Sequence, residues 1–338
     1  MISTRVEQQI PTLADVQAAR RRIAPYLMPT PLLPHGALSE LVGTEVVVKH
    51  ENHLPTGAFK VRGGVNLVSQ LSEDERRRGV VTASTGNHGQ SIAFAAGRFG
   101  VRAIVCVPEE PNPVKLAAME RLGAELVVHG RDFDEAREHC EALAREHGSR
   151  YVHSGNEPHL IAGVGTATLE LLETQPDVDV VIVPVGGGSG AAGACVAGKA
   201  VKPELEVIGV QSSAAPAAFR SWQVRQLLED RMETSAEGLA TRVAFELPQR
   251  ILWDRLDDFM LVDEDELERA VVLMIEGTRN LVEPAGAAPL AAAMRLRDRL
   301  AGKNADPERR QHQPGPAARH PRPRGVSSAQ KPARADST

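Results

Sequence analysis

The sequence contains little cysteine, no long apolar run and no excess of positive charge. Among its 338 residues the cysteines are Cys106, Cys140 and Cys195, and their spacing matches neither a disulfide framework nor a metal knuckle. No apolar run approaches the roughly 18 residues that a membrane-spanning helix needs, and the N-terminal stretch lacks the apolar core of a signal peptide. These absences predict a cytoplasmic protein in a reducing compartment, without a membrane partner.

Charge and composition narrow the class of ligand. The formal net charge is -5 and the sequence pI is about 6.1, which gives no basis for nucleic-acid binding because that usually requires a clustered basic face. Apolar residues make up 42% and charged residues 25%, as is usual for globular proteins, and the length suggests about two lobes. We therefore expect a small-molecule partner and no nucleic acid.

Short β-rich runs alternate with amphipathic helices in two stretches of the chain. The first contains VVTAS, VRAIVCVP and AELVVHG, with helices expected at residues 87–100, 112–123 and 132–147, and then RYVHSG. The second contains VDVVIVPV, LEVIGVQS and DFMLVDE, with helices expected at 265–280 and 283–300. The first two of these runs are dense enough for strands buried on both faces. The pattern predicts two parallel α/β units whose ligands lie beyond the carboxyl ends of the strands.

Three glycine-containing loops carry most of the chemical information, and the first is ASTGNHGQ at residues 83–90. It leads from a strand into a helix, where converging backbone amides can bind a carboxylate or a phosphate. The same residues also fit a tight turn capped by Thr85 or Asn87, with His88 packed rather than catalytic.

The second loop is VPVGGGSG, which leaves an apolar strand and enters a helix. Its consecutive glycines let backbone amides close around an anion where a side chain would block the approach. The spacing of Gly188, Gly190 and Gly193 lacks the acidic partner of a dinucleotide site, and the loop has no P-loop lysine. A single phosphate is the predicted ligand, and a simple flexible turn is the alternative.

The third loop, PTGAFKVRGG at residues 55–64, places Lys60 between small residues and a glycine pair. An isolated lysine in such company usually lies on the surface with its stem along the protein. Beside a phosphate-binding loop, however, a desolvated lysine suits Schiff-base chemistry with an aldehyde cofactor.

Together these loops resemble the motifs of fold type II pyridoxal-phosphate enzymes, in the branch of threonine/serine dehydratases and serine racemases. PTGAFKVRGG resembles the lysine motif, STGNHGQ the substrate-carboxylate loop, GGGSG the phosphate loop, and LVEPAGAAPLAA a segment near the cofactor ring. The resemblance covers roughly residues 14–303. It implies a two-domain α/β fold like that of the tryptophan synthase β subunit, each domain an open, mostly parallel sheet flanked by helices. A large cofactor-binding domain would comprise residues 1–70 and 154–303, and a small domain residues 71–153.

The resemblance also implies a role for individual residues. Lys60 would form the Schiff base with pyridoxal 5'-phosphate and then act as the base at the substrate α-carbon, Phe59 would pack under the pyridine ring, and Asn87 would bond to its 3-hydroxyl group. The implied phosphate ligands are Gly186, Gly187, Gly188, Ser189 and Gly190. The implied substrate-binding residues are Ser84, Thr85, Gly86, Asn87 and His88. Gly238 and Glu283 would border the ring.

The implied reaction is β-elimination of water from a 3-hydroxy amino acid of the threonine or serine class, yielding a 2-oxo acid and ammonia. Thr85 stands where serine racemases have their second acid/base serine, which makes racemisation the less favoured alternative, and β-replacement is another. Residues 211–217 lack the acidic residues with which some relatives bind a divalent ion, so we expect no metal. The family predicts a homodimer or a homotetramer.

The C-terminal stretch departs from the family. After Lys303 the resemblance would require a buried strand and a Ser-Gly-Gly-Asn turn, but residues 304–338 are rich in proline and arginine, and Val326 is their sole large apolar residue. Such a segment buries too little surface to offset the entropy of ordering it, so we predict disorder. A second hypothesis follows, namely a cofactor-binding relative with impaired catalysis.

Overall fold

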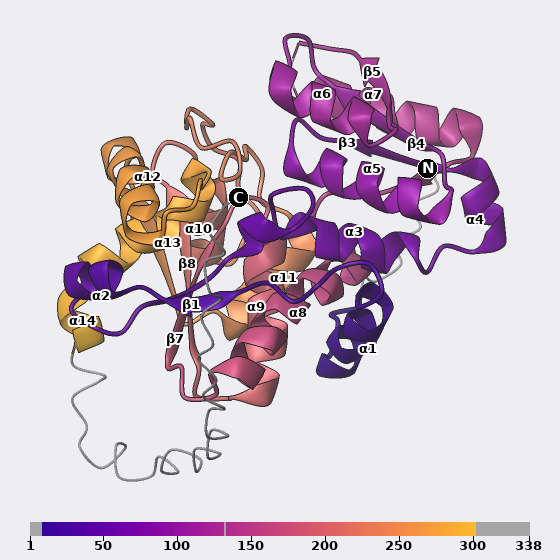
Figure 1. Ribbon diagram of the computed structural model, residues 1–338. Coiled ribbons are helices and arrows are strands. Elements are labelled where there is room, and N and C mark those ends of the chain that lie inside the picture. The colour runs from indigo at the N-terminus through magenta and orange to yellow at the C-terminus, as the bar shows by residue number, and fades with distance from the viewer. Residues whose placement is uncertain (1–8, 132, 302–338) are drawn as a thin grey trace, which may run out of the picture.

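The computed structural model describes residues 9–131 and 133–301 (Figure 1). Two parallel sheets with their own helices lie side by side, and a short antiparallel pair, β1 (Leu32–Pro34) and β2 (Val47–Lys49), precedes them in the chain. The N-terminal helical elements are α1 (Leu13–Ile23), α2 (Gly36–Val42), the 3-10 turn η1 (Glu51–His53) and α3 (Lys60–Val68). No helix in the described ranges is long and apolar enough to cross a membrane.

The first parallel sheet has the strand order β5-β4-β3-β6. Its strands are β3 (Val80–Ala83), β4 (Ala103–Val107), β5 (Glu125–Val128) and β6 (Arg150–Tyr151), and its helices are α4 (Glu73–Arg78), α5 (Asn87–Phe99), α6 (Pro113–Arg121) and α7 (Phe133–His147). Every residue of β3 and β4 is buried, because helices cover the sheet and a strand pairs on either side. The predicted alternation of strands and helices is confirmed here, and Gly100 caps α5 in the left-handed conformation with φ of 64°.

The second parallel sheet has the order β7-β8-β9. Its strands are β7 (Val180–Pro184), β8 (Glu206–Ser212) and β9 (Asp258–Val262). The helices around it are α8 (Pro158–Thr174), α9 (Ser189–Val201), α10 (Ala217–Val224), α11 (Glu246–Arg255), α12 (Glu264–Thr278), α13 (Pro284–Arg295) and α14 (Arg297–Ala301). Apolar clusters fill both faces of this sheet, one with side chains from α9 and α11 and the other with side chains from α12 and α13.

Two sequence expectations for this sheet were wrong in detail. β8 is buried along its whole length, as predicted, but β7 is only half-buried at every position. Both faces of β7 pack against helices, but it is one of the two edge strands within the described residues, so one side of its backbone lacks a neighbouring strand. The helix expected at residues 283–300 is interrupted at Leu296, between α13 and α14.

The glycine pair of the lysine motif explains how α3 fits between two other helices. A Cβ built on Gly63 would lie 3.0 Å from the carbonyl oxygen of Leu160 in α8, and one built on Gly64 would lie 2.4 Å from Ser91 Oγ in α5. The Ser91 hydroxyl also donates to the carbonyl oxygen of Lys60 at 2.6 Å. Only a helix with glycine at both positions can approach α5 and α8 this closely.

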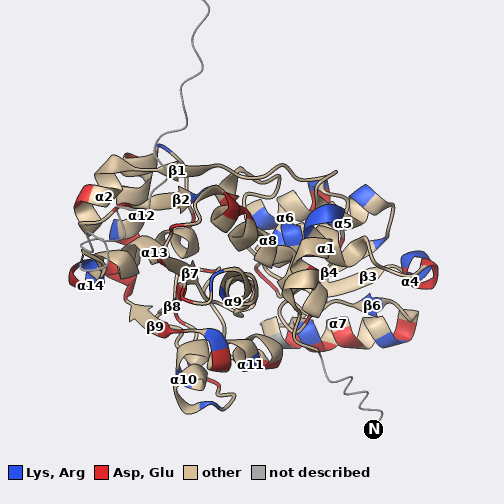
Figure 2. Cartoon of the chain, turned by 90° about the horizontal axis from the view of Figure 1, so that it is seen from below, with Lys and Arg blue, Asp and Glu red and all other residues tan. Residues whose placement is uncertain are grey.

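Charged residues lie along outer helices such as α4 and α7, whereas α9, which leads away from the glycine loop, is mostly tan (Figure 2). The division into a large domain and a small domain of residues 71–153 stays a prediction, although all four strands of the first sheet fall within that range. The predicted disorder of residues 304–338 concerns a segment outside the described residues.

Candidate active site

Lys60 is the first residue of α3. Its amine lies between the segment that follows β6 in the first sheet and the loop that follows β7 in the second. Nζ donates to Ser189 Oγ at 2.7 Å and lies 3.5 Å from the carbonyl oxygen of Ser154. Burial lowers the pKa of the Lys60 amine to about 8, since the charged form loses hydration that its neighbours do not replace. A larger fraction of the amine is therefore neutral near pH 7 than for an exposed lysine, as a nucleophile requires.

The glycine loop between β7 and α9 leaves no room for side chains. A Cβ built on Gly187 would lie 2.3 Å from the Phe245 ring, and one built on Gly186 would lie 2.4 Å from the carbonyl oxygen of Gly238. Gly188 has φ of 87°, a left-handed conformation that glycine adopts without strain. The amides of this loop and of the first turn of α9, a helix of 13 residues, lie at a helix N-terminus, a position that can bind an anion.

The aromatic ring of Phe59 packs against this same loop. Its Cζ would lie 3.0 Å from a Cβ built on Gly190, and the Lys60 amine lies 5.6 Å from the ring centroid. Phe59, Lys60, Ser189 and Gly190 are thus neighbours in space, although about 130 positions separate the two motifs in the sequence.

The loop of residues 84–88 is held by its own serine. Ser84 Oγ accepts hydrogen bonds from the amides of Gly86 at 3.1 Å and Gly89 at 2.9 Å, which sets the backbone at the start of α5. The amide of Ser84 itself donates to the carbonyl oxygen of Cys106 in β4. Thr85 is half-buried beside it. The hydroxyl of Ser84 therefore shapes the loop, in addition to the substrate contact that the resemblance implies.

Asn87 and Glu283 meet from opposite sides of the site. Asn87 Nδ2 donates to both carboxylate oxygens of Glu283, at 2.8 and 3.1 Å. Glu283 Oε1 lies 3.5 Å from a Cβ built on Gly238, so Gly238 sits against this pair as well. The structure brings the ring-bordering residues predicted from the sequence into contact with one another.

The His88 side chain lies away from the open side of the loop. It is buried, and its Nε2 lies 2.8 Å from Thr82 Oγ1 in β3. Burial, together with the nearby charge of Lys60, lowers the pKa of His88 to about 3. Its imidazole is therefore neutral at physiological pH and serves packing, while its backbone amide stays at the N-terminus of α5.

Several neighbours of the site were not found from the sequence. His153 stacks edge-on against Phe245 with 4.8 Å between ring centroids, and its Nδ1 accepts from the amides of Gly155 and Asn156, both at 3.0 Å. Burial, with Arg137 and Lys60 nearby, lowers the pKa of His153 to about 4. None of these residues belongs to a glycine motif, so only tertiary packing could reveal them.

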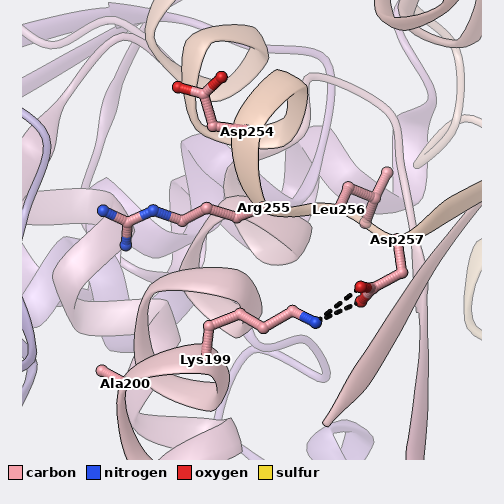
Figure 3. Close-up of a pocket in the computed structure, with 6 residues that line it drawn as sticks. All are labelled: Lys199, Ala200, Asp254, Arg255, Leu256 and Asp257. Carbon is pink, nitrogen blue, oxygen red and sulfur yellow. Dashed lines mark hydrogen bonds and ion pairs between the residues drawn. The ribbon is translucent and has the colours of Figure 1, made fainter. Parts of the chain in front are cut away.

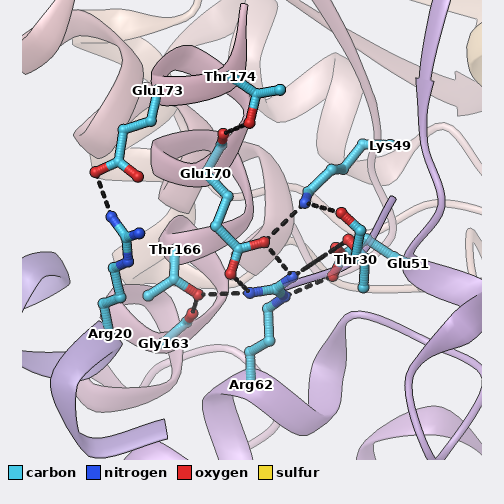
Figure 4. A network of polar contacts seen from close by, with 10 residues as sticks. All are labelled: Arg20, Thr30, Lys49, Glu51, Arg62, Gly163, Thr166, Glu170, Glu173 and Thr174. Atoms are coloured by element: carbon cyan, nitrogen blue, oxygen red, sulfur yellow. Dashed lines mark hydrogen bonds and ion pairs between the residues drawn. The ribbon is translucent and has the colours of Figure 1, made fainter. Parts of the chain in front are cut away.

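A buried ion network lies two residues beyond Lys60 (Figure 4). Arg62 is 1% exposed and bonds to the carboxylates of Glu51 and Glu170, with four contacts between 2.7 and 2.9 Å. Lys49 Nζ lies 2.7 Å from Glu170 Oε2, and Thr166 Oγ1 accepts from Arg62 at 3.1 Å. Two cations and two carboxylates balance, so the network ties the chain before the lysine motif to α3 and α8 without a net buried charge.

The pocket of Figure 3 lies far from this site. It has a volume of about 440 Å³ and is lined by residues 199–200 and 254–257, at the opposite end of α9 from Ser189. Lys199 pairs there with Asp257, at 2.6 Å. Within residues 9–131 and 133–301 there is also no group of three or more His, Cys, Asp or Glu side chains that could hold a metal ion.

Comparison with known proteins agrees with this arrangement of lysine and glycine loop. Residues 23–306 match the model of the pyridoxal-phosphate dependent enzyme family. The chain belongs to this family. It is 39% identical over 290 residues to an L-threonine ammonia-lyase of Thermotoga maritima, covering 85% of this chain and 72% of that protein. It also resembles the solved structure of the T.th. threonine deaminase, with a TM-score of 0.81, 38% identity, and coverage of 86% and 94%.

A serine racemase is also similar to this chain. The structure of that enzyme from Dictyostelium discoideum has a TM-score of 0.81 and 34% identity, covering 86% of this chain and 94% of that one. The shared architecture is that of the fold type II pyridoxal-phosphate enzymes, as the sequence predicted.

The residues present fit the family's cofactor, pyridoxal 5'-phosphate. Lys60 supplies a desolvated amine for an aldehyde, and the backbone amides of residues 186–190, at the N-terminus of α9, can bind a phosphate. The distance from Lys60 to Ser189 places the amine next to the N-terminus of α9. One small cofactor could therefore bond to the amine and bind to the amides at the same time.

Proposed function

We propose that this protein removes water from a 3-hydroxy amino acid of the L-threonine or L-serine class, with pyridoxal phosphate as its cofactor, to give a 2-oxo acid and ammonia. The observation that carries the proposal is the hydrogen bond from Lys60 Nζ to Ser189 Oγ at 2.7 Å. It places a reactive amine beside the helix N-terminus that we assign to the cofactor phosphate. The relatives named as threonine ammonia-lyases and threonine deaminases support the substrate class.

In this proposal each part of the site has one task. When bound, the cofactor supplies the electron sink that stabilises the charge left at the α-carbon. Lys60 would be the amine that bonds to the cofactor aldehyde and later takes the α-proton, because burial lowers its pKa and so favours the neutral nitrogen more than in an exposed lysine. The amides of residues 186–190 would hold the phosphate, and Phe59 would support the ring.

The remaining residues orient the substrate. Ser84 fixes the loop whose amides, at residues 85–88, would bind the carboxylate at the N-terminus of α5. Asn87 would bond to the 3-hydroxyl group of the cofactor, and its contact with Glu283 holds that amide in place. Gly238 lies against Glu283 and would border the ring.

The test uses the purified, cofactor-loaded protein. L-threonine and L-serine are supplied, and 2-oxo acid and ammonia are followed together with any D-amino acid. Release of 2-oxo acid supports the proposal; formation of D-serine without 2-oxo acid would assign racemisation instead. Lys60→Ala should abolish the cofactor's visible absorbance and its turnover, whereas Lys199→Ala, at the remote pocket, should change neither. We further infer that the protein acts in the cytoplasm. We also infer that it forms a homodimer or a homotetramer, and sedimentation of the loaded protein tests this oligomeric state.

A further inference from the structure

A lysine reaches over the loop that we assign to the substrate carboxylate. Lys115 lies in the first turn of α6, and its Nζ would be 3.1 Å from a Cβ built on Gly86. The Cδ of the same lysine would lie 3.2 Å from that Cβ. The lysine stem therefore passes directly over Gly86, the residue that caps α5. Because Gly86 has no side chain, the space above the loop is open to the ammonium group.

The ammonium group of Lys115 contacts a carboxylate from the opposite side of the site. Lys115 Nζ lies 2.5 Å from Glu237 Oε2, and Asn112 Nδ2 donates to Glu237 Oε1 at 3.0 Å. Glu237 directly precedes Gly238, which borders both Gly186 and Glu283. One ion pair thus connects the substrate loop's side of the site with the segment next to the glycine loop.

This ion pair is accessible to solvent. The side chain of Lys115 is 19% exposed and that of Glu237 is 43% exposed. Because Glu237 is the exposed partner of the pair, water and salt screen part of the attraction. A second carboxylate that arrives at the loop can therefore replace Glu237 at small cost.

The loop itself carries no formal positive charge. Residues 84–88 are Ser, Thr, Gly, Asn and His, and His88 is neutral because its imidazole is buried against Thr82. Without Lys115, a bound carboxylate would meet only backbone dipoles and neutral side chains. An ammonium group above Gly86 supplies the full charge that backbone amides lack.

We propose that Lys115 binds the carboxylate of the substrate. In the absence of substrate, Glu237 pairs with the Lys115 ammonium group, and the substrate carboxylate then replaces Glu237. Lys115 is then a specificity residue for amino acids with a free carboxylate. This inference rests on the proposed function, since it takes residues 84–88 as the carboxylate loop.

The experiment measures binding separately from turnover. L-alanine, which has a carboxylate but no leaving group, is titrated into the cofactor-loaded protein while the cofactor's absorbance spectrum is followed. Lys115→Gln should raise the dissociation constant of L-alanine about ten- to a hundredfold, the loss expected for one charge-assisted hydrogen bond. Lys115→Arg, which keeps the charge, should stay within about threefold of the wild type. Glu237→Gln, which removes the competing carboxylate, should leave the dissociation constant equal or lower.

A neutral ligand and a remote ion pair serve as controls. L-alanine methyl ester lacks the carboxylate, so its dissociation constant should be about the same for Lys115→Gln and the wild type. Arg102→Gln breaks a solvent-exposed ion pair with Glu125. Arg102 directly precedes β4 and Glu125 is the first residue of β5, so the pair lies at the amino ends of these strands, and its loss should not change the binding of either ligand.

Four results would overturn the inference. The first is L-alanine binding that is unchanged in Lys115→Gln, and the second is equal weakening of the acid and the ester. The third is tighter binding by both Lys115→Gln and Glu237→Gln, which would mean that the ion pair only blocks the site. The fourth is failure of the loaded wild type to bind L-alanine. If the binding pattern holds but no 3-hydroxy amino acid is turned over, the proposed function fails while the role of Lys115 stands.

Discussion

His88 donates its Nε2 proton to Thr82 Oγ1, 2.8 Å away, and the direction of this hydrogen bond is fixed by a third group. The Thr82 hydroxyl donates its own proton to the carbonyl oxygen of Val152 at 2.8 Å, so its oxygen must accept from the imidazole. The chain of two bonds joins the first turn of α5 to β3 and to the segment after β6. It leaves Nδ1 of His88 as a buried acceptor with no partner among the described residues.

Thr82→Val keeps the shape of the side chain and removes the hydroxyl. It removes the buried group that accepts from the imidazole and donates to the Val152 carbonyl oxygen, so we expect the free energy of unfolding to fall by about 2–4 kcal/mol. Urea denaturation of the loaded protein measures the loss. Thr174→Val, at an exposed hydroxyl that bonds within α8, should cost less than about 0.5 kcal/mol. Equal effects of the two variants would contradict the buried role of Thr82.

The two buried histidines predict how stability depends on pH. Burial lowers the pKa of His88 to about 3 and that of His153 to about 4, whereas both titrate near 6.5 in an unfolded chain. Between these values the unfolded chain binds more protons, so the free energy of unfolding falls as the pH falls below about 6.5. The slope contributed is at most about 1.4 kcal/mol per pH unit for each histidine. Urea titrations at pH 7 and pH 5 measure it.

A variant that removes one of the titrating groups provides the control. His153→Gln should reduce the loss of stability between pH 7 and pH 5, because one histidine then no longer takes up a proton on unfolding. His139→Gln, at a half-buried ring stacked on His129, should leave the difference unchanged. A pH dependence that persists fully in His153→Gln would show that other groups cause it.

How much of this site the sequence predicts depends on the kind of contact. The glycine motifs predict backbone geometry, because glycine allows close approach of the backbone, and the structure places Ser189, which follows the three glycines, next to Lys60. Side chains such as Lys115 and Phe245 lie in helices or loops without a diagnostic local pattern, and their positions depend on how two sheets pack. The half-buried state of β7 likewise depends on its place in the strand order, which its own residues do not encode.

Gly187→Ala tests the phosphate-binding role of the glycine loop directly. The added Cβ would lie 2.3 Å from the Phe245 ring, so the loop or the ring must move, and we expect the affinity for pyridoxal phosphate to fall at least about tenfold. Equilibrium titration of the cofactor-free protein measures the dissociation constant. Phe245→Leu in the Gly187→Ala background should restore part of the affinity because it makes room for the methyl group. Gly36→Ala, with no atom near the added Cβ, should have no effect.

The Arg62 network predicts a large loss of stability from one buried substitution. Arg62→Met removes the cation that lies between Glu51 and Glu170 and leaves two carboxylates in a buried site with Lys49 alone, so the free energy of unfolding should fall by about 3–5 kcal/mol. The pKa of Glu170, which burial raises, is lowered overall by Arg62 and Lys49, so it should rise in the variant. The deficit in stability should therefore shrink as the pH is lowered and the carboxylates take up protons.

The control is an exposed ion pair. Arg20→Gln, which breaks the exposed pair with Glu173, should cost no more than about 1 kcal/mol at any pH. A pH-independent deficit in Arg62→Met would mean that lost packing, not uncompensated charge, is the cause.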